Sequence, residues 1–259
     1  MSLSERMHYF ARSVRAAGWT PAIRYNLDRL RRSLGKPSRG VLRLQPKGVR
    51  YPFTVRAGES SDIAVFRQIF LEQQYRMSNP PSAVGSILDV GANIGLASIY
   101  YLNRFPEARV LAVEPDPGNY RICLENLAPY EARARVLHGA LWPRCTRLAL
   151  SRWGDQREWA TTVAEPENAG EATVQSWDMP TLLAMAGFET VDLLKIDIEG
   201  SERELFEEPC ESWLARASNL CIELHGKQSE EVFYRAMSAF AWEAEQMGEV
   251  LACRNIRLR

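Results

Sequence analysis

One short segment combines two glycines with an aspartate and an asparagine directly after an apolar run. The segment Ile87–Gly95 reads ILDVGANIG. Glycine is needed where a ligand must approach the backbone closely or where φ is positive. The pattern predicts a buried strand that runs into a ligand-binding turn, with a helix beginning after the turn.

A second carboxylate, Glu114, ends the next apolar run. In doubly wound sheets an acidic side chain about twenty residues after the glycine turn accepts hydrogen bonds from ribose hydroxyls. The turn and Glu114 together therefore predict a site for a nucleoside-containing cofactor. The candidate contacts are Asp89, Gly91, Asn93, Gly95 and Glu114.

Two cofactors use this arrangement. A dinucleotide prefers G-x-G-x-x-G, because its pyrophosphate sits on the helix N-terminus. Counted from Gly91, the second and third glycine positions hold Asn93 and Leu96. S-adenosylmethionine has no phosphate and tolerates the observed D-x-G-x-N-x-G. The segment therefore favours S-adenosylmethionine, and an NAD-dependent oxidoreductase is the alternative.

Further polar residues follow two later apolar runs. Asp197 and Glu199 follow the first, and Glu223 and His225 end the second. His225 is a candidate general base because imidazole titrates near neutral pH, although a hydrogen-bonded histidine at a strand end is an equal alternative. Asp197 is a candidate for orienting cofactor or substrate, with Glu223 beside it, and Glu199 could instead cap the following helix.

A divalent cation is a second interpretation of the same strand ends. Asp197, Glu223 and His225 could hold Mg²⁺. An ion at this place would acidify a hydroxyl group of the substrate. Mg²⁺ prefers oxygen ligands in near-octahedral geometry, and one of these three candidates is a histidine. We therefore expect a reaction without a metal.

The elements that position these residues alternate between strand and helix patterns. Expected strands cover 86–90, 109–114, 135–138, 191–197 and 220–224, and expected helices cover 96–103, 119–127, 201–206 and 230–240. This alternation predicts an α/β domain with a mostly parallel sheet and helices on both faces. The stretch 141–177 interrupts the rhythm, and 242–259 predicts a closing hairpin around Gly248.

The interrupting stretch predicts an inserted hairpin. It is rich in tryptophan and contains turn residues such as Gly154-Asp155. Its tryptophans could stack on sugar faces, but the core of the hairpin is the favoured role. They are Trp142, Trp153, Trp159 and Trp177.

The N-terminal residues differ from the rest. Residues 1–40 hold nine Lys and Arg against Glu5 and Asp28, and they predict a basic amphipathic helical extension. An apolar stripe recurs at Ile23, Leu27, Leu30 and Leu34. It could contact an anionic membrane or another copy of the chain, but packing on the main domain is favoured. Residues 41–80 predict a strand-helix segment with a turn at Pro46-Lys47-Gly48, and residues 81–259 predict the cofactor-binding domain.

The composition limits the class of protein. The chain has 259 residues, and its 32 Lys and Arg balance 32 Asp and Glu, which gives no support for nucleic-acid binding. The five cysteines are scattered without a CxxC pair, which favours a reducing cytoplasm. No signal peptide or membrane span is expected.

At this point the residues resemble the FkbM family of methyltransferases. The matching segments are Asp89–Gly95, Glu114–Pro117, Val191–Glu202 and Ile222–His225, and Val55-Arg56 with Ser61-Asp62 and Phe66 resembles the segment before the domain. The similarity covers residues from about 50 to about 245 and leaves out the basic N-terminus. His138-Gly139 departs from the family pattern, which often has Asn-Ala where this chain has Gly139-Ala140.

The resemblance implies a class I methyltransferase fold, S-adenosylmethionine as cofactor and methyl transfer to a hydroxyl. The acceptor is commonly a sugar, a glycan or another natural product. Asp89, Gly91, Asn93, Gly95 and Glu114 would line the cofactor, with Ala140 near the adenine. A methyltransferase fold that only binds, without catalysis, is a further alternative.

Overall fold

The computed structural model forms two compact units, residues 1–74 and residues 75–259. The described residues are 7, 10–11, 13–15, 17–35, 40–58, 60–152, 161–166 and 172–259. The first unit takes in the predicted helical extension and most of the predicted strand-helix segment. The second unit holds every residue proposed for the cofactor or for catalysis.

The first unit packs helices on a small antiparallel sheet. Its elements are α2 (Trp19–Ser33), β1 (Val41–Leu44), β2 (Phe53–Arg56), α3 (Asp62–Phe66) and the π-helical turn η1 (Arg67–Leu71). The predicted turn at Pro46-Lys47-Gly48 lies between β1 and β2, and their antiparallel pairing places Val41 opposite Arg56. Aromatic rings fill the interior. The ring centroid of Phe66 lies 5.9 Å from that of Tyr25 and 6.3 Å from that of Phe53.

Helix α2 buries a different face from the one that its sequence suggests. Ala22 and Tyr25 are buried, and the Arg24 guanidinium donates to the carbonyl of Arg43 on β1. The stripe of Ile23, Leu27, Leu30 and Leu34 is exposed, whereas the sequence led us to expect it to be buried. The small Ala22 allows close approach of the helix to the hairpin, and Tyr25 supplies the apolar contact with Phe66.

The second unit is built on a seven-stranded sheet with the order β12-β13-β11-β10-β3-β4-β5. The strands are β3 (Ser86–Val90), β4 (Arg109–Glu114), β5 (Ala134–His138), β10 (Leu193–Ile196), β11 (Leu220–Glu223), β12 (Phe240–Met247) and β13 (Val250–Leu258). Neighbours from β5 to β11 are parallel, and β13 runs antiparallel to both β11 and β12. The predicted closing hairpin is therefore confirmed as β12–β13.

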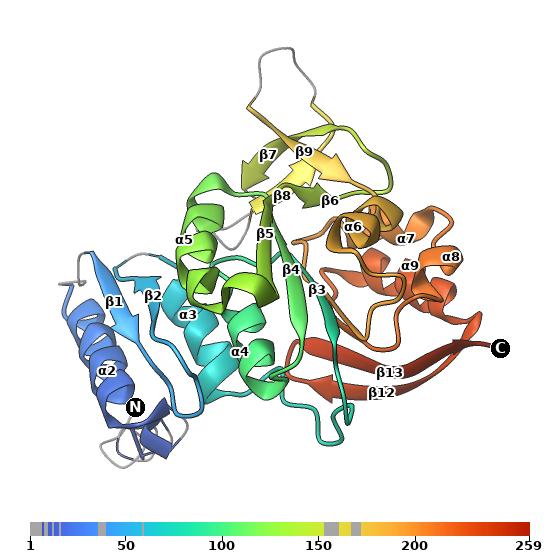
Figure 1. Cartoon of the computed structure of the whole chain (residues 1–259). Helices are drawn as coiled ribbons and strands as arrows, with labels where there is room; N and C mark the ends of the chain where they lie inside the picture. The colour runs from blue at the N-terminus through green and yellow to red at the C-terminus, as the bar shows by residue number, and fades with distance from the viewer. Residues whose placement is uncertain are drawn as a thin grey trace. The chain divides into compact units, whose positions relative to one another are not determined.

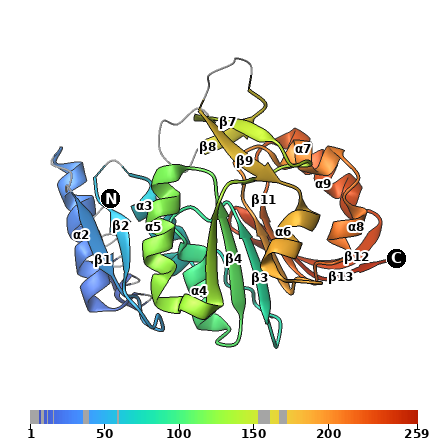
Figure 2. The same ribbon diagram turned by 45° about the horizontal axis from the view of Figure 1, so that its top comes forward.

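Helices cover both faces of this sheet (Figure 2). They are α4 (Leu96–Arg104), α5 (Pro117–Leu127), the 3₁₀ helix η2 (Ala128–Arg133), α6 (Met179–Ala186), α7 (Glu202–Glu207), α8 (Glu211–Leu214) and α9 (Lys227–Met237). Helix α5 begins where Asp116 accepts hydrogen bonds from the amides of Gly118 and Asn119. The expected α/β class with helices on both faces is confirmed.

Alternation along the strands sorts the buried side chains between the two faces. Leu88 and Val90 of β3 join a core with residues of α6, α7, α8 and α9. Asp89, between them, faces α4, where the Ser98 hydroxyl donates to its carboxylate at 2.6 Å. At β3 one face is therefore apolar, and the other carries a buried carboxylate.

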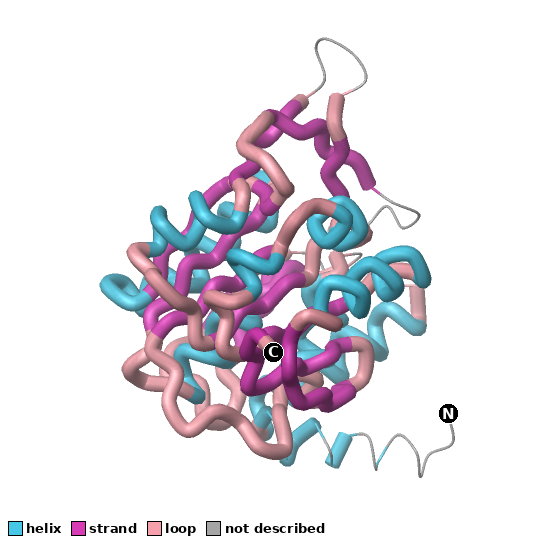
Figure 3. The backbone as a smooth tube through the Cα atoms, turned by 90° about the vertical axis from the view of Figure 1, so that its right-hand side faces the viewer, coloured by secondary structure: helices cyan, strands magenta, loops and turns pink. Residues whose placement is uncertain are grey.

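The interrupting stretch forms a second sheet with the order β6-β9-β7-β8 (Figures 1 and 3). Its strands are β6 (Ala140–Leu141), β7 (Arg147–Arg152), β8 (Thr161–Ala164) and β9 (Thr173–Trp177). The predicted hairpin corresponds to the antiparallel pair β7–β8, and β9 and β6 extend it.

Tryptophan contributes to the packing of this region. Trp142 is buried in a cluster with Leu148, Val163 and Val174, and Trp177 packs against the core of the main sheet. Both side chains therefore serve the core, as favoured from the sequence. Trp153 and Trp159 lie outside the described residues. Among the helices that the structure describes, none has the length and apolar composition needed to cross a membrane.

Candidate active site

A cavity open to solvent lies at the carboxyl ends of β3, β4 and β10. The chain continues from β3 to β4 on one side of it and later places β10 on the other side. The order of the strands therefore reverses at β3. Such a switch point is where open α/β sheets bind ligands. The lining residues are Val90, Gly91, Asn93, Glu114, Pro115, Asn119, Gly139, Ala140, Leu141, Thr161, Val163, Asp197, Ile198 and Glu199.

The glycine turn after β3 forms one wall of the cavity. Gly91 has φ +74°, and a Cβ atom there would lie 1.7 Å from the backbone oxygen of Asp197. Only glycine therefore fits between the two strand ends. Asn93 also has positive φ, at 52°, and its side-chain oxygen accepts from the amide of Ile94 at 2.7 Å. Asparagine tolerates this conformation better than most residues, which explains its place in the turn.

Glu114 closes the opposite wall at the end of β4, and it is 4% exposed. One carboxylate oxygen accepts from the amide of Asn93 at 2.7 Å, and the other accepts from the amide of Asp116 at 2.9 Å. Burial raises the pKa of Glu114 to about 7, in spite of these hydrogen bonds. Oε1 also accepts from the Asn119 side chain at 3.4 Å, whereas Oε2 has room for a second donor and can still accept from a ligand hydroxyl.

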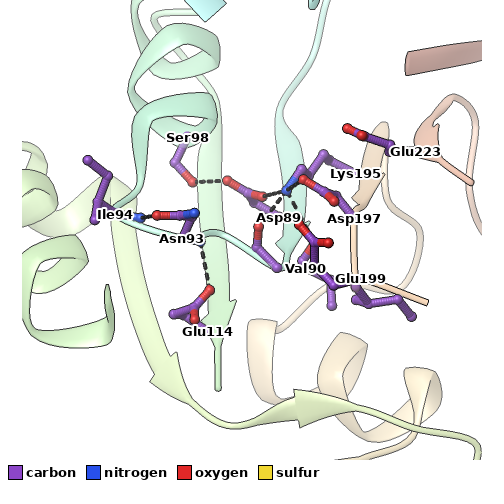
Figure 4. A network of polar contacts seen from close by, with 12 residues as sticks. Asp89, Val90, Asn93, Ile94, Ser98, Glu114, Lys195, Asp197, Glu199 and Glu223 are labelled. Carbon is purple, nitrogen blue, oxygen red and sulfur yellow. Dashed lines mark hydrogen bonds and ion pairs between the residues drawn. The ribbon is translucent and has the colours of Figure 1, made fainter. Parts of the chain in front are cut away.

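Asp89 and Gly95 support the turn from behind and do not line the cavity. Asp89 is fully buried, with Ser98 on one oxygen and the Lys195 ammonium 3.4 Å from the other (Figure 4). Gly95 has φ +82°, and a Cβ atom there would lie 2.9 Å from the sulfur of Cys123 on α5. Direct contact of these two residues with a cofactor stays a prediction.

The Lys195 ammonium links the carboxyl ends of β3 and β10 (Figure 4). Its ammonium lies 3.4 Å from Asp89 and 3.3 Å from Asp197, and it donates to the backbone oxygen of Gly91 at 2.5 Å. Burial lowers the pKa of Lys195, but the carboxylate of Asp197 and the surrounding groups hold it well above its usual range. This role was not predicted, although a lysine inside an apolar run is itself a signal of a buried ion pair.

Asp197 lies directly after β10 and lines the cavity. Its amide donates to the carbonyl of Val90 at 3.1 Å, which fixes it beside the glycine turn. One side-chain oxygen faces Lys195, and the other is buried without a hydrogen-bond partner in the described part of the chain. A buried acceptor of this kind is costly unless a ligand donor satisfies it.

His225 lies among three glutamates. Its Nδ1 is 3.0 Å from Glu202, and its Nε2 is 3.5 Å from Glu199 and 3.7 Å from Glu223. Burial lowers the pKa of His225, but the hydrogen bond to Glu202 and the nearby carboxylates outweigh it and raise the pKa to about 9. The imidazole is therefore charged at neutral pH in the free protein.

The pKa values of two carboxylates that face His225 are raised as well. Burial, with the charge of Asp197, raises the pKa of Glu199 to about 8 and that of Glu223 to about 7. Glu199 has positive φ, at 52°, and points into the cavity rather than capping α7. Glu202, the first residue of α7, accepts with its carboxylate from the amides of Ile198 and Gly200 in the loop before the helix.

Ligand atoms of Asp197, Glu199 and His225 all lie within 4.8 Å of one another. This set differs from the one considered from the sequence, because Glu199 replaces Glu223. A charged imidazole has no lone pair for a metal, and its ring protons already neutralise the carboxylates around it. In the chain without an ion, the imidazolium therefore offsets part of this negative charge, and a reaction without a metal stays a prediction.

Gly139 occupies the bend where the chain passes from β5 to β6. A Cβ atom at this position would lie 2.0 Å from the Trp177 ring and 2.6 Å from the backbone oxygen of Gln175. The departure from the family pattern therefore has a steric cause. Ala140, the next residue, lines the cavity as predicted for a cofactor contact, although the contact itself stays a prediction.

The cavity thus gathers Gly91, Asn93, Glu114, Ala140 and Asp197 from the predicted set. His225 and Glu223 lie just beyond it, next to Glu199. Asn119, Thr161 and Val163 also line it and were not predicted, because their positions depend on how α5 and the small sheet fold back.

The order of the seven strands, with one reversed strand next to the edge, is that of the class I methyltransferases. The family model described as Methyltransferase FkbM domain matches residues 89–252, and the chain belongs to this family. It is a methyltransferase by family and by fold.

Known methyltransferases are similar to this chain over about three fifths of its length. Methyltransferase sdnD of Sordaria araneosa is 28% identical over 190 residues, covering 61% of this chain and 73% of that protein. The 2-O-methyltransferase NoeI of Sinorhizobium fredii (strain NBRC 101917 / NGR234) is 28% identical over 179 residues, covering 63% of this chain and 68% of that protein. The solved methyltransferase FkbM from Methylobacillus flagellatus KT has a TM-score of 0.47 at 14% identity, covering 66% of this chain and 43% of that longer chain.

Proposed function

We propose that the chain is an S-adenosylmethionine-dependent O-methyltransferase. The observation that carries this proposal is the meeting of Gly91, Glu114 and Asp197 in one cavity at the switch point of the sheet. The turn brings a backbone close to the ligand, and Glu114 offers a carboxylate for ribose hydroxyls. Neither wall presents the three-glycine turn of a dinucleotide site, which disfavours an NAD-dependent oxidoreductase.

The residues of the cavity suit the parts of this cofactor. Glu114 would accept from the ribose, and the unsatisfied oxygen of Asp197 would accept from the ammonium of the methionine moiety. Pro115, Ala140 and Leu141 supply apolar surface for the adenine. When bound, the cofactor supplies a methyl group on a sulfonium centre for in-line displacement.

The remaining work of the chain is to position the acceptor and to take its proton. In this proposal Nε2 of His225 is the general base for the acceptor hydroxyl, and Glu202 holds the ring through Nδ1. General base catalysis of this kind contributes about 10²–10⁴-fold. Asp197 and Glu223 orient the reacting groups and keep the imidazole basic.

The acceptor we propose is a hydroxyl of a sugar, a glycan or another natural product. The relative NoeI is named a 2-O-methyltransferase, which supports oxygen as the acceptor atom. The acidic residues beside the cavity disfavour a phosphodiester backbone, so we do not propose a nucleic-acid substrate.

Cofactor binding is tested with Glu114→Ala. Loss of hydrogen bonds to a charged group should weaken S-adenosylmethionine by about 1.5–3 kcal/mol in calorimetry. The matched control is Asp116→Ala, which removes a carboxylate that caps α5 and does not line the cavity. Equal affinity of Glu114→Ala and the parent chain would contradict the assignment, and absence of any binding to the parent chain would contradict the cofactor.

The base is tested with His225→Ala in an assay with labelled methyl donor and a panel of glycans and glycosides. We expect the transfer rate to fall about 10²-fold or more while cofactor affinity is nearly unchanged. Full activity of the variant would leave positioning alone as the mechanism. EDTA should leave activity unchanged, and activity lost in EDTA and restored by Mg²⁺ would replace the base with a metal site.

A further inference from the structure

Helix α2 and the residue directly after it, Leu34, carry five large apolar side chains on one exposed face. The exposed fractions are 68% for Trp19, 43% for Ile23, 49% for Leu27, 48% for Leu30 and 66% for Leu34. Their spacing of three or four residues places them in a single stripe along the helix. Single exposed apolar residues are ordinary, but a continuous stripe of this kind marks a binding surface.

The stripe is not part of the core of its own unit. The opposite face of α2 carries Ala22, Tyr25 and Asp28, which are all buried. Tyr25 contacts Phe66 of α3, and Arg24 is bonded to the hairpin. Helix α2 is therefore held by its other face, and the stripe is directed away from the hairpin.

Charge is distributed unevenly between the two units. Residues 1–74 hold 14 of the 32 Lys and Arg but five of the 32 Asp and Glu, which leaves 18 basic and 27 acidic residues in 75–259. The first unit is therefore strongly basic in a chain whose formal net charge is zero. Arg24 and Arg31 are exposed and lie on the turns beside the stripe.

We propose that the exposed stripe of α2 binds the surface of an anionic lipid membrane, with the helix lying in the plane of the interface. An apolar face bordered by arginines suits this position, because the leucines enter the acyl boundary while the guanidinium groups reach the headgroups. Trp19, at the start of the helix, is a residue type that membrane interfaces favour. The basic charge of the unit adds attraction to anionic lipids.

A second copy of the chain fits the same surface less well. A symmetric contact would place the stripe of one copy on the same stripe of the other. It would bring two basic units together, each with 14 Lys and Arg against five Asp and Glu. Anionic headgroups supply the charge that such a contact lacks.

The test is flotation of the full-length chain with vesicles of phosphatidylcholine, with and without phosphatidylglycerol. We expect binding to the vesicles that contain phosphatidylglycerol, weakened by salt, and little binding to the neutral ones. Leu30→Glu should reduce binding about tenfold or more, because it replaces a side chain whose burial is worth that factor. The matched control Ser33→Glu adds the same charge to the same helix outside the stripe and should bind nearly as the parent does.

Three results would overturn the proposal. One is a parent chain that binds neither kind of vesicle. Another is a concentration-dependent dimer that Leu30→Glu abolishes in the absence of vesicle binding, which would assign the stripe to a second copy. The third is a fall in melting temperature for Leu30→Glu but not for Ser33→Glu, together with equal vesicle binding by both variants, which would show that the stripe packs within the chain.

Discussion

The environment of His225 explains how a histidine could act as a base although it is charged at neutral pH. Glu202 is fully buried and holds Nδ1, and Glu199 and Glu223 face Nε2. With a pKa of about 9, the neutral imidazole is scarce at pH 7 but is a stronger base than an ordinary histidine. A bound sulfonium cation would lower this pKa and so release the base when the cofactor is present.

Glu202→Gln should lower the pKa of His225, because it removes the largest contribution that raises it. We expect the rise of kcat/KM with pH to move to lower pH and the high-pH plateau to fall, since the imidazole becomes less basic. The matched control is Glu207→Gln on the same helix, whose carboxylate pairs with Arg203 at the surface. A variant that folds normally and keeps the pH profile of the parent would contradict the role given to Glu202.

At the residue scale the sequence supports those site positions that end an apolar run. Glu114, Asp197 and Glu223 could be predicted because the carboxyl ends of parallel strands meet at one edge. Glu199 could not, because its place in the cavity depends on a left-handed backbone conformation at φ 52°. Lys195 lies in mid-strand, and its partners Asp89 and Asp197 become visible only when β3 and β10 are known to be neighbours.

At the scale of elements, the alternation of apolar and polar residues was sufficient for the main sheet and insufficient for the smaller one. The central strands β3, β4, β10 and β11 are nearly continuous buried runs, and the helices between the strands show their own period. Strand β6 has only two residues and pairs with β9, far along the chain, so no local pattern marks it. Helix α8, with four residues, is also too short for a local pattern. Helix α6 was not predicted although the chain carries signals for it, an N-cap at Asp178 and a left-handed glycine, Gly187, at its end.

Gly139→Ala tests the junction between the two sheets. The new Cβ atom would overlap the Trp177 ring and the backbone at Gln175, so we expect a loss of about 1–3 kcal/mol of unfolding free energy from overpacking. Gly85→Ala is the matched control, because its Cβ atom would meet only the Asp192 carboxylate at an ordinary 3.5 Å. The free energies of unfolding of both variants are measured by chemical denaturation. Equal values would show that the backbone at the bend moves to accept the new Cβ atom without loss of stability.

For the whole molecule, the raised pKa values of the site make the free energy of unfolding fall as the pH rises. The pKa values of Glu114, Glu199, Glu223 and His225 are all raised, to about 7, 8, 7 and 9. The folded chain therefore binds more protons than the unfolded chain between about pH 4.5 and about pH 9. Stability contributed by these groups is present at the acidic end of this window and is lost as pH rises through each folded pKa.

A cationic ligand reverses this trend, which gives a test that involves the whole site. The sulfonium of S-adenosylmethionine favours ionised carboxylates and a neutral imidazole, so its binding should release protons. By linkage, the affinity must then rise with pH from about pH 6 to about pH 8. S-adenosylhomocysteine has the same nucleoside and amino-acid parts without the sulfonium charge. The sulfonium also lowers the pKa of the α-amino group within S-adenosylmethionine, so the titration of each free ligand is measured and subtracted from its binding profile. Calorimetry in buffers of different ionisation enthalpy should show more protons released, and a steeper rise of affinity with pH, for S-adenosylmethionine. Equal pH dependence of the two ligands would mean that the sulfonium does not sense the ionisable groups of the site, and the proposed lowering of the pKa of His225 by the bound cofactor would be wrong.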